Sequence, residues 1–294
     1  MFAAQCIQPE EKERISHFMF QKDAKAAMCG RLLIRKFLSE YLKVPYDILQ
    51  LKRTEKGKPF LGNIDCLQIK PTPHFNMAHN GDFVVLATHP QAKVGIDIMK
   101  IESPSGRSLE TFFNNMQRQF TEKEWKIIKR QPSEILQLQM FFRHWCLKES
   151  VVKALGEGIG FGLDRLEFHL NSYPLTNDQN VTDTVFYLDG KVNQFWIFEE
   201  TLLNSDHCVV VGYNFNNSDE ESFSNLQCNH TSHNEINKTD DNSEENMLSN
   251  SSKSDEHFRI LSWQEMVAGS IPQSPPDKDY WLNFNSKPDH PFKR

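Results

Sequence analysis

The sequence predicts an α+β protein of two similar lobes, each a sheet packed with helices. Three observations support this prediction: a long amphipathic helix pattern near the N-terminus, strand-length apolar runs after it, and a second helical region followed by further strand-length runs. The chain has 294 residues, 38% of them hydrophobic and 22 of them Phe, which is enough for one large or two modest cores.

The first lobe is expected to begin with a helix over residues 22–42. Its apolar positions recur at helical spacing and comprise Ala26, Gly30, Leu33, Ile34, Phe37 and Tyr41. A strand over residues 48–52 and a turn around Gly57 follow. Apolar runs at residues 83–88 and 93–98 are separated by a His-Pro pair, and we expect these two strands to pair with each other.

The second lobe is expected to begin with two capped helices. Thr121 and Glu124 have the spacing of a capping box, and Ser133 can cap a second helix that ends at Leu155, before Gly156. Four further apolar runs predict the strands of a second sheet: residues 163–170, 181–188, 194–199 and 207–215.

The chain thus divides into lobes at residues 1–101 and 102–215, a linker at residues 216–257 and a C-terminal extension at residues 258–294. The linker has ten acids against two lysines and only six apolar side chains, so we expect it to be disordered. Its charge of −8 leaves +2 for the rest of a chain whose total is −6. The extension regains strand and helix character and is expected to dock partly on the body, with residues 272–294 mostly irregular.

Composition excludes several classes of protein. A charge of +2 outside the linker is too small for a general nucleic-acid-binding protein, and no apolar run is long enough to span a membrane. The N-terminus has neither the basic nor the apolar segment of a signal peptide. Six Cys without a C-x-x-C pair predict reduced, structural thiols. We therefore expect a cytoplasmic monomer with no nucleic-acid or membrane partner.

Two carboxylates lie in apolar surroundings and need a partner, because an unpaired buried carboxylate is costly. Asp97 interrupts the strand-like run V-G-I-D-I. Glu149 lies between Trp145 and Lys153 on one stripe of the second long helix, with Lys148 beside it. Asp97 could instead be a structural residue at a strand end, and Glu149 with Lys153 a surface ion pair. The stripe is therefore either a solvated edge or a site.

Two carboxylates with nearby lysines suit a magnesium ion on a diphosphate. Mg²⁺ takes one or two carboxylates and completes its shell with water and phosphate oxygens. Two further groups suit a phosphate: the basic turn R-T-E-K-G-K at residues 53–58 and the segment F-N-M-A-H at residues 75–79. A lone basic cluster is more often a solvated turn, so these groups alone do not decide the function.

The combination of motifs resembles the 4′-phosphopantetheinyl transferases of the two-lobed Sfp type. G-I-D at residues 95–97 precedes W-C-L-K-E-S-V-V-K at residues 145–153, and the R-T-E-K-G-K and F-N-x-x-H motifs lie upstream. G-I-D alone is weak and W-x-x-K-E is moderately specific, but the ordered set is a strong signal. The resemblance covers about residues 5–215.

The resemblance implies an active site in the cleft between the lobes and a holo-[acyl-carrier-protein] synthase activity. In this reaction 4′-phosphopantetheine moves from coenzyme A to a serine of an acyl, peptidyl or aminoadipate carrier protein, and adenosine 3′,5′-bisphosphate is released. The implied partners are acyl carrier protein, or carrier domains of the fatty acid synthase and aminoadipate-semialdehyde dehydrogenase type.

The resemblance also implies roles for individual residues. Asp97 and Glu149 would hold Mg²⁺, Glu149 or a water on the metal would take the serine proton, and Lys153 would stabilise the phosphoryl group under attack. His79 would lie near the 3′-phosphate. The residues implied to bind coenzyme A are Arg14, Arg53, Thr54, Glu55, Lys56, Gly57, Lys58, Asn76, Met77, Ala78, His79, Lys148, Glu149 and Lys153.

The chain departs from the family pattern at three points. Many relatives have a second acid where this chain has Met99, so water or Asn80 is expected to supply the missing ligand. The family often has Ser where this chain has Ala78, which cannot donate to a phosphate. The family usually has a strand before the position of Arg14, so the N-terminus looks short by comparison.

Two other functions could use the same residues. A Mg²⁺-dependent hydrolase of the coenzyme A diphosphate could employ both carboxylates, but it usually needs a denser acidic cluster. A non-catalytic module that binds carrier proteins is favoured only if Met99 leaves the metal too weakly held.

Overall fold

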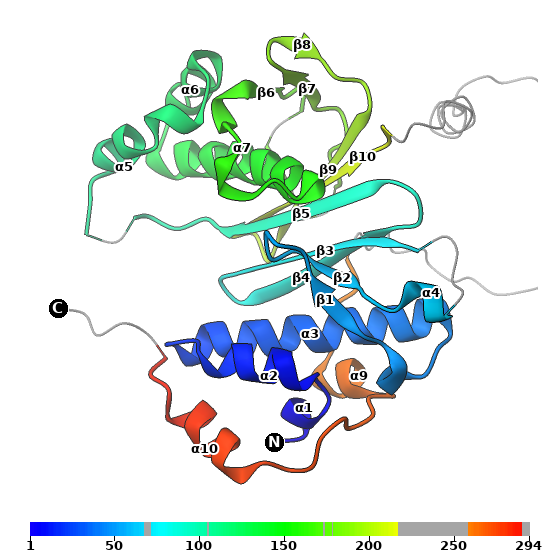
Figure 1. The fold of residues 1–294 in the computed structure, drawn as a ribbon. Helices are drawn as coiled ribbons and strands as arrows, with labels where there is room; N and C mark the ends of the chain where they lie inside the picture. Colours follow the sequence, from blue (N-terminus) through cyan, green and yellow to red (C-terminus); the bar gives the residue numbers. More distant parts are fainter. Residues whose placement is uncertain (68–71, 105, 173, 178, 217–257, 290–294) are drawn as a thin grey trace, which may run out of the picture. The chain divides into compact units, whose positions relative to one another are not determined.

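The computed structural model describes residues 1–67, 72–104, 106–172, 174–177, 179–216 and 258–289 (Figure 1). Met1–Asn216 and the described part of Leu261–Arg294 belong to one compact unit. The predicted linker lies outside the described residues except for Asn216. Helices and strands are mixed along the chain, in agreement with the α+β prediction. No described helix combines the length and the apolar character needed to cross a membrane.

The first part of the chain is helical, with α1 (Phe2–Gln5), α2 (Pro9–Ser16) and α3 (Gln21–Leu42). α3 confirms the predicted long helix and ends at Lys43, which has the left-handed backbone of a helix terminus. Its buried face contains Ala24, Leu32 and Leu38, but also Arg31 and Arg35. The two arginines therefore lie on the face that a simple amphipathic pattern reserves for apolar side chains.

Five strands follow, together with two short helices: η1 (Tyr46–Ile48), β1 (Leu51–Arg53), β2 (Pro59–Leu61), α4 (Ile64–Leu67), β3 (His74–Asn80), β4 (Phe83–His89) and β5 (Lys93–Lys100). β1 and β2 form an antiparallel hairpin around the predicted turn at Gly57. The prediction that residues 83–88 and 93–98 pair with each other is wrong. β4 pairs with β3, and β5 pairs with a strand more than 100 residues further along the chain, β10 (His207–Asn214).

Side chains link β3 to β5 where the backbone does not. The Asn76 Oδ1 accepts a hydrogen bond from Ile96 N, and the Asn80 Oδ1 accepts one from Lys100 N, both at 2.9 Å. The polar positions of β3 thus satisfy the edge of β5. They also explain why the sequence did not mark β3 as half of a hairpin, because Asn is unfavourable in an ordinary strand.

The second part of the chain packs helices on two small sheets. Its elements are α5 (Leu109–Asn115), η2 (Gln117–Gln119), α6 (Glu122–Lys129), α7 (Glu134–Leu155), η3 (Gly158–Gly160), η4 (Leu163–Arg165), β6 (Leu166–His169), β7 (Val185–Leu188), β8 (Lys191–Val192), β9 (Trp196–Leu203) and β10. The capping box of Thr121 and the caps at Ser133 and Gly156 are confirmed. The single predicted sheet is instead two sheets, β6-β7-β8 and β5-β10-β9.

The C-terminal segment contains α9 (Trp263–Val267) and α10 (Lys278–Ser286), so residues 272–294 are less irregular than predicted. Phe284 is 3% exposed and belongs to the apolar core around α1 to α3. Gln273 N donates to Gln5 O at 2.7 Å, which ties this segment to α1. The tail therefore completes the core beneath α3.

The pairing of β5 concerns the boundary between the two predicted lobes. The predicted boundary at residue 101 places β5 in the first lobe, yet β5 pairs along its whole length with β10 of the second. The division into two lobes at that residue stays a prediction.

Candidate active site

α7 presents one narrow stripe that is open to solvent. From Met140 to Ala154 every residue of this helix is buried except Trp145, Glu149 and Lys153. The rest of the helix surface is covered because α7 packs against β5, β10 and α6. The three polar or aromatic side chains that looked out of place in the sequence are thus the residues that face outward together.

The stripe forms one wall of a pocket of about 650 Å³. Other walls come from α3, the turn between β1 and β2, β3, and the segment after α7, so residues of both predicted lobes line it. The predicted site residues that the structure brings together here are Arg53, Lys56, Gly57, Lys58, Asn76, Met77, Ala78, His79, Glu149 and Lys153. Segments separated by 50 to 100 residues in the sequence therefore meet at one site.

The pocket has an excess of positive charge. Five of its lining residues are Arg or Lys and one is His79, against one acid, Glu149. Partial burial lowers the pKa of His79, and the positive charge of Lys153 adds to this effect against the opposing charge of Asp23. Trp145 and Phe161 supply flat apolar surface to the same pocket. The pocket suits a ligand with several anionic groups and a planar apolar part.

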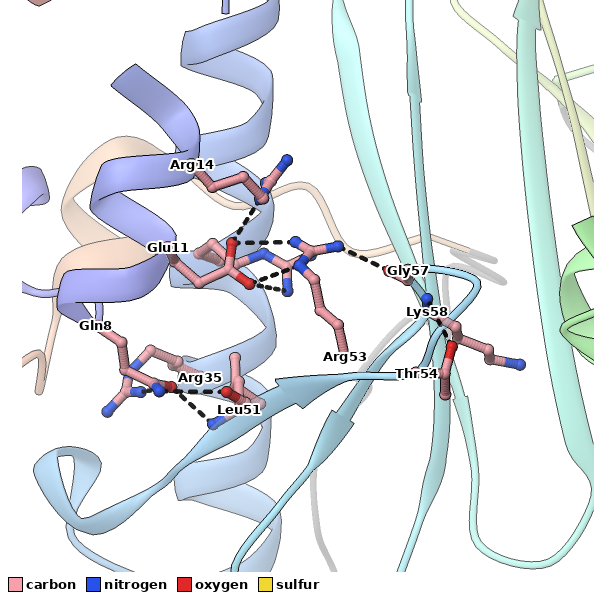
Figure 2. Close-up of polar contacts among 10 residues, drawn as sticks. Gln8, Glu11, Arg14, Arg35, Leu51, Arg53, Thr54, Gly57 and Lys58 are labelled. Carbon is pink, nitrogen blue, oxygen red and sulfur yellow. Dashed lines mark hydrogen bonds and ion pairs between the residues drawn. The ribbon is translucent and has the colours of Figure 1, made fainter. Parts of the chain in front are cut away.

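The basic turn is held in place by its own side chains. Thr54 accepts from Lys58 N through its hydroxyl at 3.1 Å, and Arg53 donates to Gly57 O at 2.8 Å (Figure 2). Gly57 has a φ of +83°, which favours glycine at this point of the turn. Thr54 and Glu55, which were predicted to bind coenzyme A, are exposed and, unlike their neighbours Lys56 and Gly57, do not line the pocket.

Lys58 joins this turn to α7. Its ammonium donates to Lys153 O at 2.7 Å and to Ala154 O at 3.1 Å, at the end of the helix where carbonyl groups lack helical partners. Burial, with a smaller contribution from Lys93, lowers the pKa of Lys58 to about 8. Lys58 therefore fixes the distance between the basic turn and the Glu149 stripe.

Asp97 lies behind the stripe and is paired on one side only. Its Oδ1 accepts from the Lys153 Nζ at 2.6 Å, and its side chain is 8% exposed. Its buried Oδ2 has no hydrogen-bond partner among the described residues. The neighbouring Cys146 thiol donates to Cys208 O at 3.6 Å, and burial, Cys208 and the Asp97 carboxylate together raise its pKa. A buried carboxylate oxygen without a donor attracts a cation.

The pKa of Glu149 depends on the nearby charge of Asp97. Partial burial, followed by the negative charge of Asp97, raises the pKa of Glu149, and Lys153 opposes them. Two carboxylates that repel each other, one with an unpaired oxygen, form a donor set that fits a hard divalent cation such as Mg²⁺. Among the residues described, no group of three or more His, Cys, Asp or Glu could hold a metal, so protein donors would fill only part of its shell.

Comparison with known proteins agrees with this geometry. Residues 1–91 match the family model described as 4′-phosphopantetheinyl transferase, N-terminal, and residues 93–211 match the 4′-phosphopantetheinyl transferase superfamily. The chain is 40% identical over 294 residues to the L-aminoadipate-semialdehyde dehydrogenase-phosphopantetheinyl transferase of Xenopus laevis, covering 100% of this chain and 89% of the relative. The chain belongs to the 4′-phosphopantetheinyl transferase family.

Other members of the family are similar over most of their length. The L-aminoadipate-semialdehyde dehydrogenase-phosphopantetheinyl transferase of Mus musculus is 41% identical over 286 residues, which cover 97% of this chain and 85% of the relative. The 4′-phosphopantetheinyl transferase gsp of Aneurinibacillus migulanus is 32% identical over 209 residues, which cover 70% of this chain and 76% of the relative. The two family models meet between residues 91 and 93, just before β5.

The position of Lys148 does not agree with the prediction that it binds coenzyme A. Its side chain is fully buried to one side of the stripe, where its Nζ pairs with the Glu124 carboxylate at 2.8 Å. The same ammonium also donates to Leu163 O and Leu166 O. Three buried acceptors satisfy the cation, so Lys148 holds α6 and the start of β6 against α7 and does not reach the pocket.

Two further expectations for the transferase family need adjustment. Asn80, which was offered as a third metal ligand, already uses its carbonyl oxygen to accept from Lys100 N. Met99 packs against the apolar core and offers no oxygen. A metal held by Asp97 and Glu149 would therefore need water and substrate oxygens to complete its shell. Arg14 does not line the pocket and pairs with Glu11 at 3.0 Å.

Sequence reasoning missed two charged residues of this phosphopantetheinyl transferase. Arg31 lines the pocket from α3, and Glu11 on α2 pairs with Arg31, Arg53 and Arg14. The available signal was that Arg31 continues the buried stripe of Ala24, Ala27 and Met28 at helical spacing. A charged residue at such a position needs a partner in the same way as Asp97 does.

Proposed function

We propose that this protein transfers the 4′-phosphopantetheinyl group from coenzyme A to a serine hydroxyl of a carrier protein and releases adenosine 3′,5′-bisphosphate. One observation carries the proposal: Glu149 and Lys153 line a cationic pocket that is large enough for a nucleotide, and Lys153 pairs with Asp97, whose charge acts on Glu149. Membership of the family supports the same reaction class.

The binding end of the pocket is suited to the phosphates of coenzyme A. Arg53, Lys56 and Arg31 supply cationic donors, and charge-assisted hydrogen bonds to phosphate are among the stronger ones. Trp145 and Phe161 offer apolar surface to the uncharged parts of the donor. Lys58 is already bonded to the end of α7, so its main role is to hold the two sides of the pocket together.

The reacting end needs a base and a cation. The serine oxygen forms a bond to the phosphorus that carries pantetheine, and the bond from this phosphorus to the oxygen shared with the adenylate phosphate breaks. Glu149, whose pKa is raised by partial burial and by Asp97, accepts the serine proton. Lys153 stabilises the charge that develops on the transferred group. A Mg²⁺ ion held by Asp97 and Glu149 would neutralise the charge of the diphosphate.

A coenzyme A diphosphate hydrolase is less well supported. Such an enzyme would be expected to gather more acids around its metal, and the described residues contain no cluster of three or more metal-binding side chains. A module that only binds carrier proteins would have no need for the unpaired Oδ2 of Asp97 behind an open stripe.

The partners that we propose are carrier proteins with a reactive serine. The Xenopus and mouse relatives are named for L-aminoadipate-semialdehyde dehydrogenase, so a carrier domain of that enzyme type is our first candidate. Acyl carrier protein and the carrier domain of a fatty acid synthase are the next candidates. We also propose that the protein acts as a monomer in the cytoplasm.

Mass spectrometry of an apo carrier protein tests this function. The carrier is incubated with the protein, coenzyme A and Mg²⁺, and the masses of carrier and nucleotide are recorded together. A gain of the phosphopantetheinyl mass with an equal yield of adenosine 3′,5′-bisphosphate supports transfer. Consumption of coenzyme A with an unchanged carrier would indicate a hydrolase. No change in either would indicate a binding module.

A further inference from the structure

Arg31 is a buried cation whose hydrogen-bonding groups are largely unused. It is 2% exposed, and neither its Nε nor its Nη1 has a hydrogen-bond partner among the described residues. Its nearest acid is Glu11, with the Nη1 3.6 Å from the Glu11 Oε1. Arg31 is also one of the residues that line the pocket, while its unpaired Nε and Nη1 are themselves buried. Unpaired buried donors are costly unless an acceptor arrives.

Arg35 is a similarly buried arginine on the same helix, and its hydrogen bonds to the protein provide a comparison with Arg31. It lies one turn further along α3 and is 1% exposed. Its Nη1 donates to the Gln8 Oε1 (Figure 2). The same Nη1 donates to Leu49 O, and the Nη2 donates to Tyr46 O at 2.6 Å. The protein therefore satisfies Arg35 with its own oxygens and leaves Arg31 without them.

Glu11 arranges the cations around Arg31. Its carboxylate accepts from the Arg53 Nε at 2.8 Å and the Arg53 Nη2 at 3.0 Å, and from the Arg14 Nε at 3.0 Å (Figure 2). One carboxylate shared by three guanidinium groups leaves a net charge of +2. Burial raises the pKa of Glu11, but the three arginines outweigh it and hold the pKa below its ordinary value, so Glu11 stays ionised at neutral pH.

We propose that Arg31 is a further ligand for the phosphate monoester of the donor substrate, and that Glu11 is a positioning residue that orients Arg31 and Arg53 toward it. The inference rests on the proposed function, because the 3′-phosphate of coenzyme A is such a monoester. A phosphate monoester is close to a dianion at neutral pH and matches the net +2 of the cluster. The diphosphate is assigned to the other end of the pocket, beside Asp97 and Glu149.

Calorimetric binding in metal-free buffer tests Arg31 without any catalysis. The ligands are adenosine 3′,5′-bisphosphate and adenosine 5′-monophosphate, which differ by the 3′-phosphate. We expect Arg31→Met to weaken the bisphosphate by at least about tenfold, the value of one charged hydrogen bond, and to leave the monophosphate nearly unchanged. Arg31→Lys should recover part of the loss. Lys25→Met, which removes an exposed cation from the same helix, should change neither. An equal effect of Arg31→Met on both ligands, or no effect, would overturn the assignment.

Kinetics test Glu11. Arg31 and Arg53 remain in Glu11→Gln, but they lose the carboxylate that orients them. We expect a raised KM for coenzyme A with little change in kcat, and no comparable change with dephospho-coenzyme A. A merely structural role would slow both donors equally and would overturn the inference. If wild-type protein transfers nothing from coenzyme A, the proposed function fails, while the calorimetry on Arg31 still decides the binding site. Glu11→Asp, which keeps the charge, replaces Glu11→Gln if the latter does not fold.

Discussion

Asp97, Glu149 and Lys148 are three charged residues in apolar surroundings, and the structure resolves them differently. Asp97 lies behind the open stripe of α7 with one buried, unpaired oxygen, and its charge adds to partial burial in raising the pKa of Glu149 on the stripe. Lys148 is one residue before Glu149 but points away from the stripe, into a pair with Glu124. Sequence could identify each of them as needing a partner, but it could not say that the partner of Lys148 lies 24 residues upstream on another helix.

Removal of either carboxylate of the stripe should abolish most activity while the fold survives. We expect Asp97→Asn and Glu149→Gln each to reduce the transfer rate by about a hundredfold or more, because a metal ligand or a general base is lost. Steady-state transfer assays with circular dichroism as a check on folding measure this. Asp189→Asn is the control, since it changes a half-exposed surface pair with Arg165. Near-normal turnover by either site variant would remove the basis for a metal site.

The Lys148–Glu124 pair should matter for stability and not for substrate binding. Lys148→Met leaves the buried Glu124 carboxylate without its cation, although Thr121 N and Phe168 N still donate to it. We expect this to lower the free energy of unfolding by about 3–5 kcal/mol. The double variant with Glu124→Gln should recover part of the loss in a double-mutant cycle. Urea unfolding measures both.

The KM for coenzyme A of folded Lys148→Met provides the contrast with the prediction from sequence. It should equal that of the wild type, because the Lys148 ammonium does not reach the pocket. A KM raised severalfold at a temperature where the variant is fully folded would return Lys148 to the coenzyme A site.

At the level of elements, the site depends on how closely α7 lies on β5. A Cβ on Gly95 would come within 1.9 Å of Ser150 O and 2.5 Å of Ala154 N, so only glycine allows this contact. Gly95 is two residues before Asp97, and Ser150 follows Glu149 in α7. The same close approach therefore brings Asp97, Glu149 and Lys153 together.

Gly95→Ala should separate these groups. We expect α7 to shift away from β5, with a loss of stability of about 1–3 kcal/mol or more from overpacking and a loss of transfer activity similar to that of Asp97→Asn. Gly160→Ala is the matched control, because a Cβ there meets nothing within 4 Å and no positive φ is involved. Unchanged melting and activity in Gly95→Ala would show that the helix does not lie as close to the strand as described.

Helices could be predicted better than sheets from this sequence. α3, α6 and α7 have local signals in their apolar spacing and caps, and these signals were sufficient. Strand pairing was predicted poorly because it is decided by distant segments: β5 pairs with β10, and β3 reaches β5 through Asn side chains. The same limit explains why sequence patterns indicated the basic turn and the β3 segment that line the pocket but not Arg31, which lies on another element.

At the level of the whole molecule, the described C-terminal segment packs against the N-terminal helices. Lys287 on the C-terminal segment donates to Ser16 O and Phe18 O, and Lys12 on α2 pairs with Asp277 at 2.7 Å. The apolar core around α1 to α3 is completed by Phe284, with Tyr280 and Trp281 beside it. No sequence pattern near the N-terminus indicated that its core would be finished by residues 280–284.

Shortening the linker should therefore have little effect on the protein, whereas a change in the C-terminal core residue Phe284 should destabilise it. Replacing residues 216–257 by a short Gly/Ser linker should leave the transfer rate within a few-fold, because their composition offers no core. Phe284→Ala should lower the free energy of unfolding by about 3–5 kcal/mol, as for other buried aromatic side chains. Thermal melts and transfer assays on both proteins compare them. A large loss of rate in the shortened protein with an intact melt would contradict the first expectation.

The central claim is that one pocket holds the donor while Asp97 and Glu149 hold the metal at its reacting end. A crystal structure of the protein with coenzyme A and Mn²⁺, with anomalous scattering used to locate the metal, tests this claim most directly. We predict one anomalous peak bonded to the Asp97 Oδ2 and to the Glu149 carboxylate, with the diphosphate beside it and the 3′-phosphate at Arg31. A metal bound away from both carboxylates, or coenzyme A bound outside the pocket, would contradict it.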